Sequence, residues 1–135
     1  MEILTTSKSQ PNSFQGHDFL VLGQSPALVS PFTSAPRPFT ASDQAGLQLN
    51  NPRRRDVAML PAFGWLAVAF RTDNPGAWLF HCHIAWHASQ GLSVQYLERA
   101  SEIPGAMDLN SITPNCNAWR SYAPTAEWPQ SDSGI

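Results

Sequence analysis

The stretch "WLAVAFRTDNPGAWLFHCHIAWHASQGLSVQYLER" runs from Trp65 to Arg99 and alternates between apolar and other residues at both ends. Alternation is typical of half-buried strands, and Leu66, Val68 and Phe70 share one predicted face. The turn sequence "NPGA" (74–77) follows, with residues suited to the central positions of a type II turn. We therefore expect a strand over Trp78–Ile84 that runs antiparallel or nearly so to the strand before it.

Other segments of the chain extend the same pattern. Short apolar runs at Asp18–Gly23 and Asp56–Ala62 predict further strands, and "IAWHASQG" (84–91) predicts one or two helical turns closed by glycine. Residues 24–52 form a long Pro- and Ser-rich excursion in which Leu47 and Leu49 could start a strand. Little strand signal follows Ala100. Many short strands without a long helix predict an all-β sandwich or barrel.

Length and composition narrow the possible partners. The 135 residues correspond to one domain, and a hydrophobic fraction of 42% with only 13% charged residues is not a disordered composition. A net charge of -2 gives no reason to expect nucleic acid as a binding partner. No apolar run approaches the roughly 18 residues of a membrane span. The start, "MEILTTSKSQPNSF", lacks the features of a signal peptide.

Potential metal ligands are concentrated in "FHCHIAWH" (80–87), which holds three of the four histidines and one of the two cysteines. On a strand, Cys82 points to one face while His81 and His83 point to the other. One mononuclear site cannot easily use all three side chains, but two metal sites on opposite faces can. The backbone around Cys82 would then connect the two metals over a few bonds, an arrangement suited to electron transfer.

The Cys82 face can be extended along the chain. His87 follows the cysteine by five residues and Leu92 by ten, a spacing that returns an imidazole to the thiolate through a short loop. A trigonal His₂Cys set with a weak axial partner is the blue-copper arrangement, and leucine at the axial position cannot donate. A structural zinc site is the main alternative, because zinc also takes Cys and His.

The pattern His81-Cys82-His83-x3-His87-x3-Gly91-Leu92 resembles the last copper motif of the multicopper oxidases, and the surrounding sequence is similar to ascomycete laccases. The resemblance implies a cupredoxin-like Greek-key β-sandwich, the C-terminal domain of such an enzyme. It also implies that Cys82 and His87 are type 1 copper ligands with Leu92 axial and non-coordinating. His81 and His83 would be type 3 ligands in a trinuclear type 2/type 3 cluster.

The family resemblance further implies an activity and a location. A phenol or aromatic amine would give single electrons near His87, which would pass by Cys82 to the cluster, where O₂ is reduced to water. The family is extracellular, and its complete members carry two upstream cupredoxin domains that this chain lacks.

The sequence departs from the family before residue 16. Laccases of this type carry His-Pro-x-His-x-His-Gly there, whereas Gln10, Ser13 and Gln15 occupy the three histidine positions of this chain. Amide and hydroxyl oxygens are harder and weaker copper ligands than imidazole. We therefore divide the chain into an atypical, irregular N-terminal segment (1–15), a cupredoxin domain (16–100) and an extension (101–135). Two explanations stay open: a truncated laccase that is inactive alone, or a short metal-binding, electron-transfer or non-catalytic protein.

Three further features complete the predictions. Cys116 matches a laccase cysteine that pairs with the first domain, so we expect a free thiol here, with a Cys82–Cys116 disulfide as the alternative. His17 is expected to be a hydrogen-bonded strand histidine and not a ligand. The ending Asp132-Ser133-Gly134-Ile135 resembles the laccase tail that plugs a channel to the trinuclear cluster.

Overall fold

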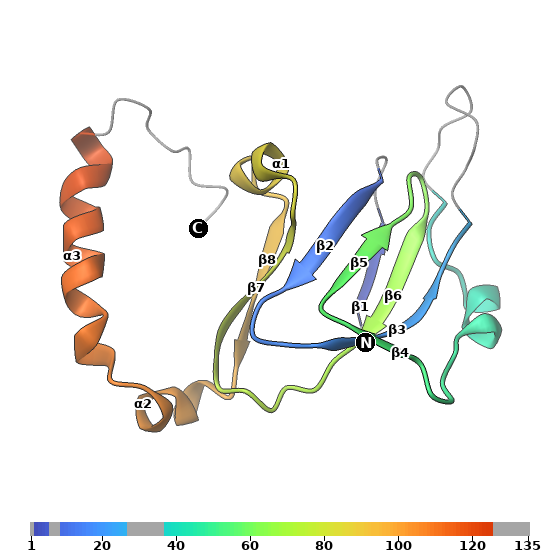
Figure 1. Ribbon diagram of the computed structural model, residues 1–135, viewed down its shortest axis with the longest axis horizontal. Coiled ribbons are helices and arrows are strands. Elements are labelled where there is room, and N and C mark those ends of the chain that lie inside the picture. Colours follow the sequence, from blue (N-terminus) through green and yellow to red (C-terminus); the bar gives the residue numbers. More distant parts are fainter. Residues whose placement is uncertain (1, 6–8, 27–36, 126–135) are drawn as a thin grey trace.

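The computed structural model describes residues 2–5, 9–26 and 37–125 and shows two four-stranded antiparallel sheets (Figure 1). The chain therefore forms the all-β sandwich expected from its alternating runs. The first sheet has the order β1 (Glu2–Thr5), β6 (Trp65–Ala69), β3 (Phe19–Gln24) and β4 (Arg53–Arg55). The second has the order β5 (Val57–Leu60), β2 (Gln10–Phe14), β7 (Gly76–Cys82) and β8 (Ser93–Glu98).

The core lies between the two sheets. Its buried side chains come from both layers: Phe14, Phe19, Leu60, Leu66, Val68 and Phe80. The alternation predicted for β6 is confirmed, since Leu66 and Val68 enter this core while Trp65 and Ala67 join a second cluster with Phe39 and Leu47. Both faces of β6 are thus covered, which explains why four of its five residues are buried.

The type II turn predicted at "NPGA" is not formed, and the strand after it does not pair with the strand before it. The strands β6 and β7 belong to different sheets, so the segment between them crosses from one layer to the other. Gly76 has no positive φ, which a type II turn would require at its position. Its role is steric, because an added Cβ would lie 2.7 Å from the Trp78 indole, whose Nε1–H donates to the Asn74 carbonyl at 2.8 Å.

The N-terminal segment is not irregular, contrary to expectation. Its described residues form β1, which pairs with β6, and β2, which lies between β5 and β7 inside the second sheet. The polar side chains of Gln10 and Asn12 hid this strand from the periodicity argument, although both are buried in the fold. The domain boundaries at residues 16 and 100 stay predictions.

The strand suggested around Leu47 and Leu49 is also absent. A 3-10 helix (Ala41–Gly46) precedes these residues, Leu47 packs on the second cluster, and Leu49 is exposed. Leu47 therefore packs against the cluster that contains Trp65 without belonging to a strand.

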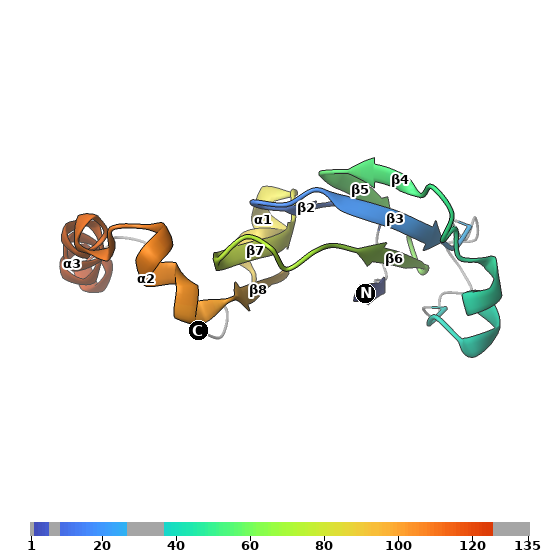
Figure 2. The same ribbon diagram turned by 90° about the horizontal axis from the view of Figure 1, so that it is seen from below.

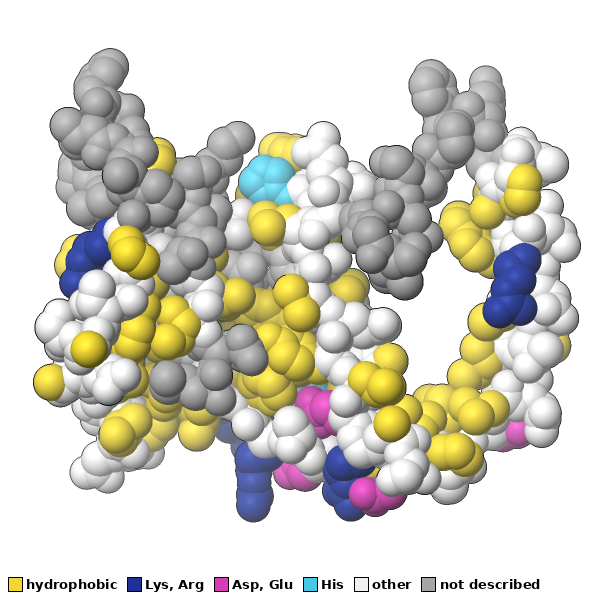
Figure 3. Space-filling view, turned by 180° about the vertical axis from the view of Figure 1, so that it is seen from behind, with side chains coloured by type: hydrophobic (Ala, Val, Ile, Leu, Met, Phe, Trp, Pro, Cys, Tyr) yellow, Lys and Arg dark blue, Asp and Glu magenta, His cyan; other side chains and the backbone are white. Residues whose placement is uncertain are grey.

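Helices account for most of the chain after β8. One helix, α1 (Ala85–Ser89), joins β7 to β8, while α2 (Ile103–Ala106) and α3 (Thr113–Tyr122) follow the sandwich. Short 3-10 turns cover 100–102, 109–111 and 123–125. Residues 103–125, called the arm below, leave the sandwich beyond β8 (Figure 2), and the space-filling view shows open space between arm and sandwich (Figure 3). No helix in the described part of the chain is long and apolar enough to cross a membrane.

Candidate metal centre

Cys82 and His87 face each other at the end of β7. The Cys82 side chain is fully buried, and its Sγ lies 3.4 Å from Nδ1 of His87. The backbone N–H of Ile84 also donates to this sulfur at 3.4 Å. A buried sulfur that meets an imidazole nitrogen and an amide N–H is positioned to act as a thiolate donor.

The loop after β7 holds His87 in place. The chain turns at Ile84, whose carbonyl accepts from the His87 N–H at 3.0 Å, and α1 carries the imidazole back over the strand end. The loop closes through two bonds at Leu92: its N–H donates to the His87 carbonyl at 2.9 Å, and its carbonyl accepts from Cys82 at 3.1 Å. The predicted axial residue Leu92 is therefore tied by its backbone to both predicted ligands.

His81 lies on β7 next to Cys82 and its side chain points to the opposite face, whereas the strand ends at Cys82 and not at Ile84 as predicted, so His83 directly follows it. Their ring centroids are 5.5 Å apart with planes inclined by 30°. His81 Nδ1 lies 2.9 Å from the carbonyl oxygen of Cys82, and because a carbonyl only accepts, Nδ1 carries the proton. In the neutral ring this leaves the Nε2 lone pair of His81 available for a metal.

The Cys82–His87 pair could bind a metal ion, because its donor atoms are sulfur and nitrogen and the distance between them is close to that found around a bound metal. Around a tetrahedral zinc ion, bonds of about 2.3 Å to sulfur and about 2.0 Å to nitrogen place the two donor atoms about 3.5 Å apart. The observed separation of 3.4 Å is close to this value. A third donor is less obvious, since no group of three His, Cys, Asp or Glu side chains in the described residues could hold a metal.

Gln10 occupies the position where the family would place a second imidazole. Its side chain is 2% exposed, and its Oε1 has no hydrogen-bond partner in the structure. Asn12 pairs directly with Cys82 across the β2–β7 ladder, so Gln10, two residues earlier, points to the same face as the cysteine. The residues present thus fit a metal with thiolate and imidazole donors, but not with the family's full imidazole set. Ser13 and Gln15 likewise bring no imidazole to the His81 face, where Ser13 pairs with His81.

His17 is engaged elsewhere. Its Nε2 lies 3.2 Å from a carboxylate oxygen of Glu98, and its ring stacks on Phe14 at 4.5 Å between centroids. The prediction of a hydrogen-bonded histidine is confirmed, although His17 lies just before β3 and not within it. The Glu98 partner was missed, because 81 positions separate the two residues and no local pattern connects them.

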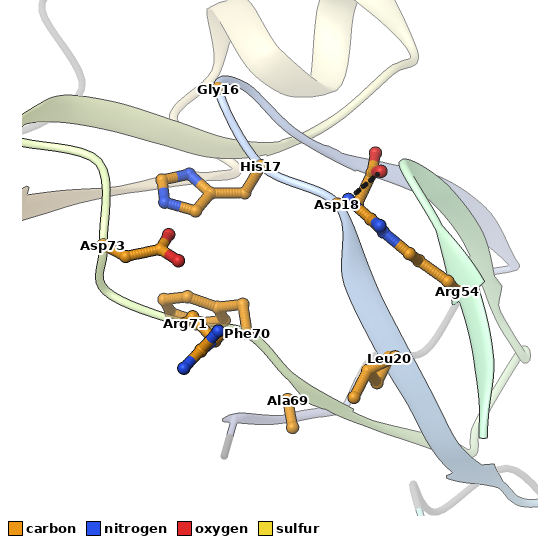
Figure 4. Close-up of a pocket in the computed structure, with 9 residues that line it drawn as sticks. All are labelled: Gly16, His17, Asp18, Leu20, Arg54, Ala69, Phe70, Arg71 and Asp73. Carbon is orange, nitrogen blue, oxygen red and sulfur yellow. Dashed lines mark ion pairs between the residues drawn. The ribbon is translucent and has the colours of Figure 1, made fainter. Parts of the chain in front are cut away.

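A cavity of about 530 Å³ lies beside His17 (Figure 4). His17 and Asp73 turn toward one another across it, and Arg54 pairs with Asp18 at its rim at 2.8 Å. None of the predicted copper ligands lines this cavity. Its lining consists of Gly16, His17, Asp18, Leu20, Arg54, Ala69, Phe70, Arg71 and Asp73.

Both cysteines are free thiols in the structure, Cys82 buried and Cys116 half-buried on α3. The alternative disulfide between them is therefore not formed. The tail Asp132–Ile135 lies outside the described residues, and its predicted role stays a prediction.

Comparison with known proteins assigns the family. The multicopper oxidase model matches residues 3–102, so the match includes both N-terminal strands. Laccase-2 of Podospora anserina is 55% identical over 129 residues, covering 93% of this chain and 21% of the relative. The laccase of Neurospora crassa is 51% identical over 133 residues, covering 96% and 22%. The chain spans about a fifth of the length of these curated relatives.

Solved structures agree on the fold. The crystal structure of a laccase from Botrytis aclada superposes with a TM-score of 0.73 at 41% identity, covering 94% of this chain and 22% of that one. Fet3p, described as a multicopper oxidase that functions in iron import, superposes with a TM-score of 0.74 at 26% identity. The match covers 85% of this chain and 23% of the Fet3p chain. With its cupredoxin-like sandwich and the pairing of Cys82 with His87, the chain belongs to the multicopper oxidase family, whose cofactor is copper.

Proposed function

We propose that this chain is the electron-entry domain of a laccase-like multicopper oxidase. The observation that carries the proposal is the placement of the buried Cys82 sulfur against His87 at the end of β7, with the rings of His81 and His83 lying close together beside it. Substrates of the complete enzyme would be phenols or aromatic amines, with O₂ as the final acceptor. We further propose the C-terminal position within the complete enzyme and the extracellular location that the family resemblance implies.

Cys82 and His87 would hold a type 1 copper ion. Bound there, copper supplies a reversible one-electron couple. His87 is half-buried and its neighbour Trp86 is exposed, so an aromatic substrate can approach this end of the molecule. Leu92 would occupy the axial side without donating.

His81 and His83 would serve the trinuclear type 2/type 3 cluster. The route from the thiol to these rings is short, because each histidine is bonded to Cys82 through one peptide unit and His81 also donates to its carbonyl. Reduction of one O₂ to two H₂O consumes four electrons and four protons, so four substrate oxidations balance each turnover. With two of the family's eight cluster imidazoles, this chain alone should not turn over.

A chimaeric laccase tests the proposal. Residues 3–102 would replace the matching segment of Podospora anserina laccase-2, first unchanged and then with Gln10, Ser13 and Gln15 each changed to His. We expect the unchanged chimaera to be inactive and the altered one to consume O₂ with a phenol. A Cys82→Ser copy of the altered chimaera is the control and should be inactive.

Two results would contradict the proposal. One is an altered chimaera that folds and loads copper but takes up no oxygen with a phenol. The other is equal oxygen uptake by the Cys82→Ser control, which would remove the thiol from the electron route.

A small metal-binding or electron-transfer role is the second candidate. It is favoured by the three lost imidazoles, because the Cys82–His87 pair is retained while the cluster set is not. A reversible one-electron wave from the copper-loaded 135-residue chain, combined with an inactive altered chimaera, would favour this role over the first.

A further inference from the structure

We propose that the side-chain carbonyl of Gln10 is the third metal donor of the Cys82–His87 centre, giving a thiolate–imidazole–amide set. This inference rests on the metal centre of the proposed function and adds a ligand that the family pattern does not contain. Gln10 thus acts as a donor in its own right and not as an inert replacement for the missing imidazole.

The register of the second sheet places Gln10 within reach. Asn12 is the cross-strand partner of Cys82, so Gln10 is a diagonal neighbour of the cysteine on the same face of the sheet. Diagonal neighbours have Cα atoms about 7–8 Å apart, which a side chain as long as glutamine can bridge. Since β7 ends at Cys82, the position opposite Gln10 belongs to the turn that leads into α1 and His87.

The end of the ladder fixes this geometry. The last bond between the two chain segments runs from the His83 N–H to the Pro11 carbonyl at 2.8 Å. Pro11 directly follows Gln10, so the backbone beside the glutamine is anchored against the segment that starts the His87 loop. On the other side, Gln10 pairs with Leu60 of β5, a fully buried core residue.

The buried amide lacks an internal partner on its oxygen. Gln10 is 2% exposed, and Oε1 is one of three buried side-chain N or O atoms without a hydrogen bond among the described residues. The other two are Nε1 of Trp65, a donor, and Oε1 of Glu98, whose other oxygen meets His17. A buried acceptor without a partner is costly, and a metal cation on the Cys82 face would take its lone pair.

The amide oxygen changes the chemistry of the centre. Oxygen is a harder donor than imidazole nitrogen, so replacing one imidazole by an amide reduces the preference for soft Cu⁺. Blue-copper sites accept a glutamine oxygen as a weak axial ligand, so an amide oxygen and a thiolate can share one copper ion. The Gln10 centre should therefore stabilise Cu²⁺ relative to Cu⁺ more than a two-imidazole centre would.

Cobalt titration of the 135-residue chain tests the assignment. Co²⁺ would be added without oxygen, and the thiolate-to-cobalt absorption band would report binding at Cys82. In Gln10→Leu the affinity for Co²⁺ should fall by at least about tenfold, the smaller loss usually seen when even outer partners of a metal are removed. In Gln10→Glu, which keeps an oxygen at the same reach, the affinity should be retained or increased.

Matched controls separate coordination from folding. Ser13→Ala alters the same strand on its opposite face and should leave the Co²⁺ affinity unchanged. Thermal unfolding of the metal-free variants should show Gln10→Leu at least as stable as the parent, because an unpartnered buried acceptor is replaced by an apolar group.

The outcomes are distinguishable from one another. An unchanged affinity in Gln10→Leu, with the thiolate band present, would overturn the Gln10 assignment and leave the metal centre standing. Equal losses in the Leu and Glu variants would also overturn it, because they would trace the effect to packing. Absence of any thiolate band in the parent chain would overturn both this inference and the metal centre beneath it.

Discussion

Cys82 contacts predicted metal ligands through both its side chain and its backbone. Its thiol faces His87 inside the sandwich, while its carbonyl accepts the Nδ1–H of His81 on the other side. That hydrogen bond gives a second link between the cysteine and a predicted cluster ligand, parallel to the covalent chain. At this scale, the backbone of Cys82 connects the two sets of predicted ligands.

Leu92→Met should lower the reduction potential of the copper-loaded chain. A thioether at the axial position donates to Cu²⁺ and stabilises it relative to Cu⁺, which leucine cannot do. Voltammetry of the parent and the variant measures the shift. Val94→Met is the control, since Val94 lies two residues further along the chain, in β8, and is exposed. A potential that rises or stays constant would remove Leu92 from the axial role.

His17→Ala should destabilise the fold by about 3 kcal/mol, because it leaves the Glu98 carboxyl buried without its imidazole partner and removes the ring stacked on Phe14. The side chains of His17 and Glu98 are only 4% and 2% exposed. Urea unfolding gives the free energy. Arg54→Ala breaks the exposed pair with Asp18 and should cost at most about 1 kcal/mol. Similar losses in both variants would contradict this distinction.

At the scale of elements, the connection between β2 and β3 depends on a glycine. Gly16 has φ of 72°, a left-handed conformation, and an added Cβ would overlap the ring of Trp78. The same turn places His17 toward Glu98, so the backbone conformation and the buried pair depend on each other.

Gly16→Ala should therefore cost at least about 2 kcal/mol of unfolding free energy, combining left-handed strain with the steric overlap. Gly46→Ala is the matched control, because Gly46 has no positive φ and no atom within 4 Å of an added Cβ. Its effect should stay within about 0.5 kcal/mol. Equal midpoints in thermal unfolding of the two variants would show that the turn tolerates a side chain.

The elements that the sequence predicted well are those whose burial follows a local period. Alternation identified β6, and the run at 84–91 closed by glycine correctly predicted the short helix α1. The failures were non-local. The sequence of β2 is polar, yet its pairing with β5 and β7 places Gln10 and Asn12 in a buried position that no local pattern indicates. The turn before Gly76 has hairpin residues, yet the flanking strands find partners in different sheets.

Across the whole molecule, the sandwich and the arm are nearly independent. Residues of α3 are exposed apart from the half-buried Cys116, and the helix packs mainly on the short turns beside it. The multicopper oxidase model ends at residue 102, just before the arm, although the laccase relatives match more than 90% of the chain.

A chain that ends at Glu102 should therefore keep the stability of the sandwich to within about 0.5 kcal/mol. Chemical denaturation monitored by tryptophan fluorescence would compare it with the full chain, using far-ultraviolet circular dichroism to confirm loss of helix. A drop in the unfolding midpoint beyond this range would mean that the arm supports the sheets.

The outer face of the second sheet exposes apolar side chains that a complete enzyme could cover. Met59 is 50% exposed and Leu97 66% exposed. These two side chains lie on the opposite edge strands β5 and β8. Exposed apolar side chains favour association, so the isolated chain should self-associate at high concentration, and Met59→Lys with Leu97→Lys should reduce this. Sedimentation velocity measures the change. Lysine at Leu49, an exposed residue away from this sheet, is the control and should have little effect.

The ladder between β2 and β7 also has a consequence during synthesis on the ribosome. Asn12 pairs with Cys82, which is synthesised roughly 70 positions later. At a translation rate of about 5–20 residues per second, β2 therefore lacks its β7 partner for roughly 4–14 s. During that interval β2 offers an open hydrogen-bonding edge to other nascent chains. The proposed third donor, Gln10, would meet Cys82 and His87 only after the ladder closes, so the complete proposed metal centre would form after that step.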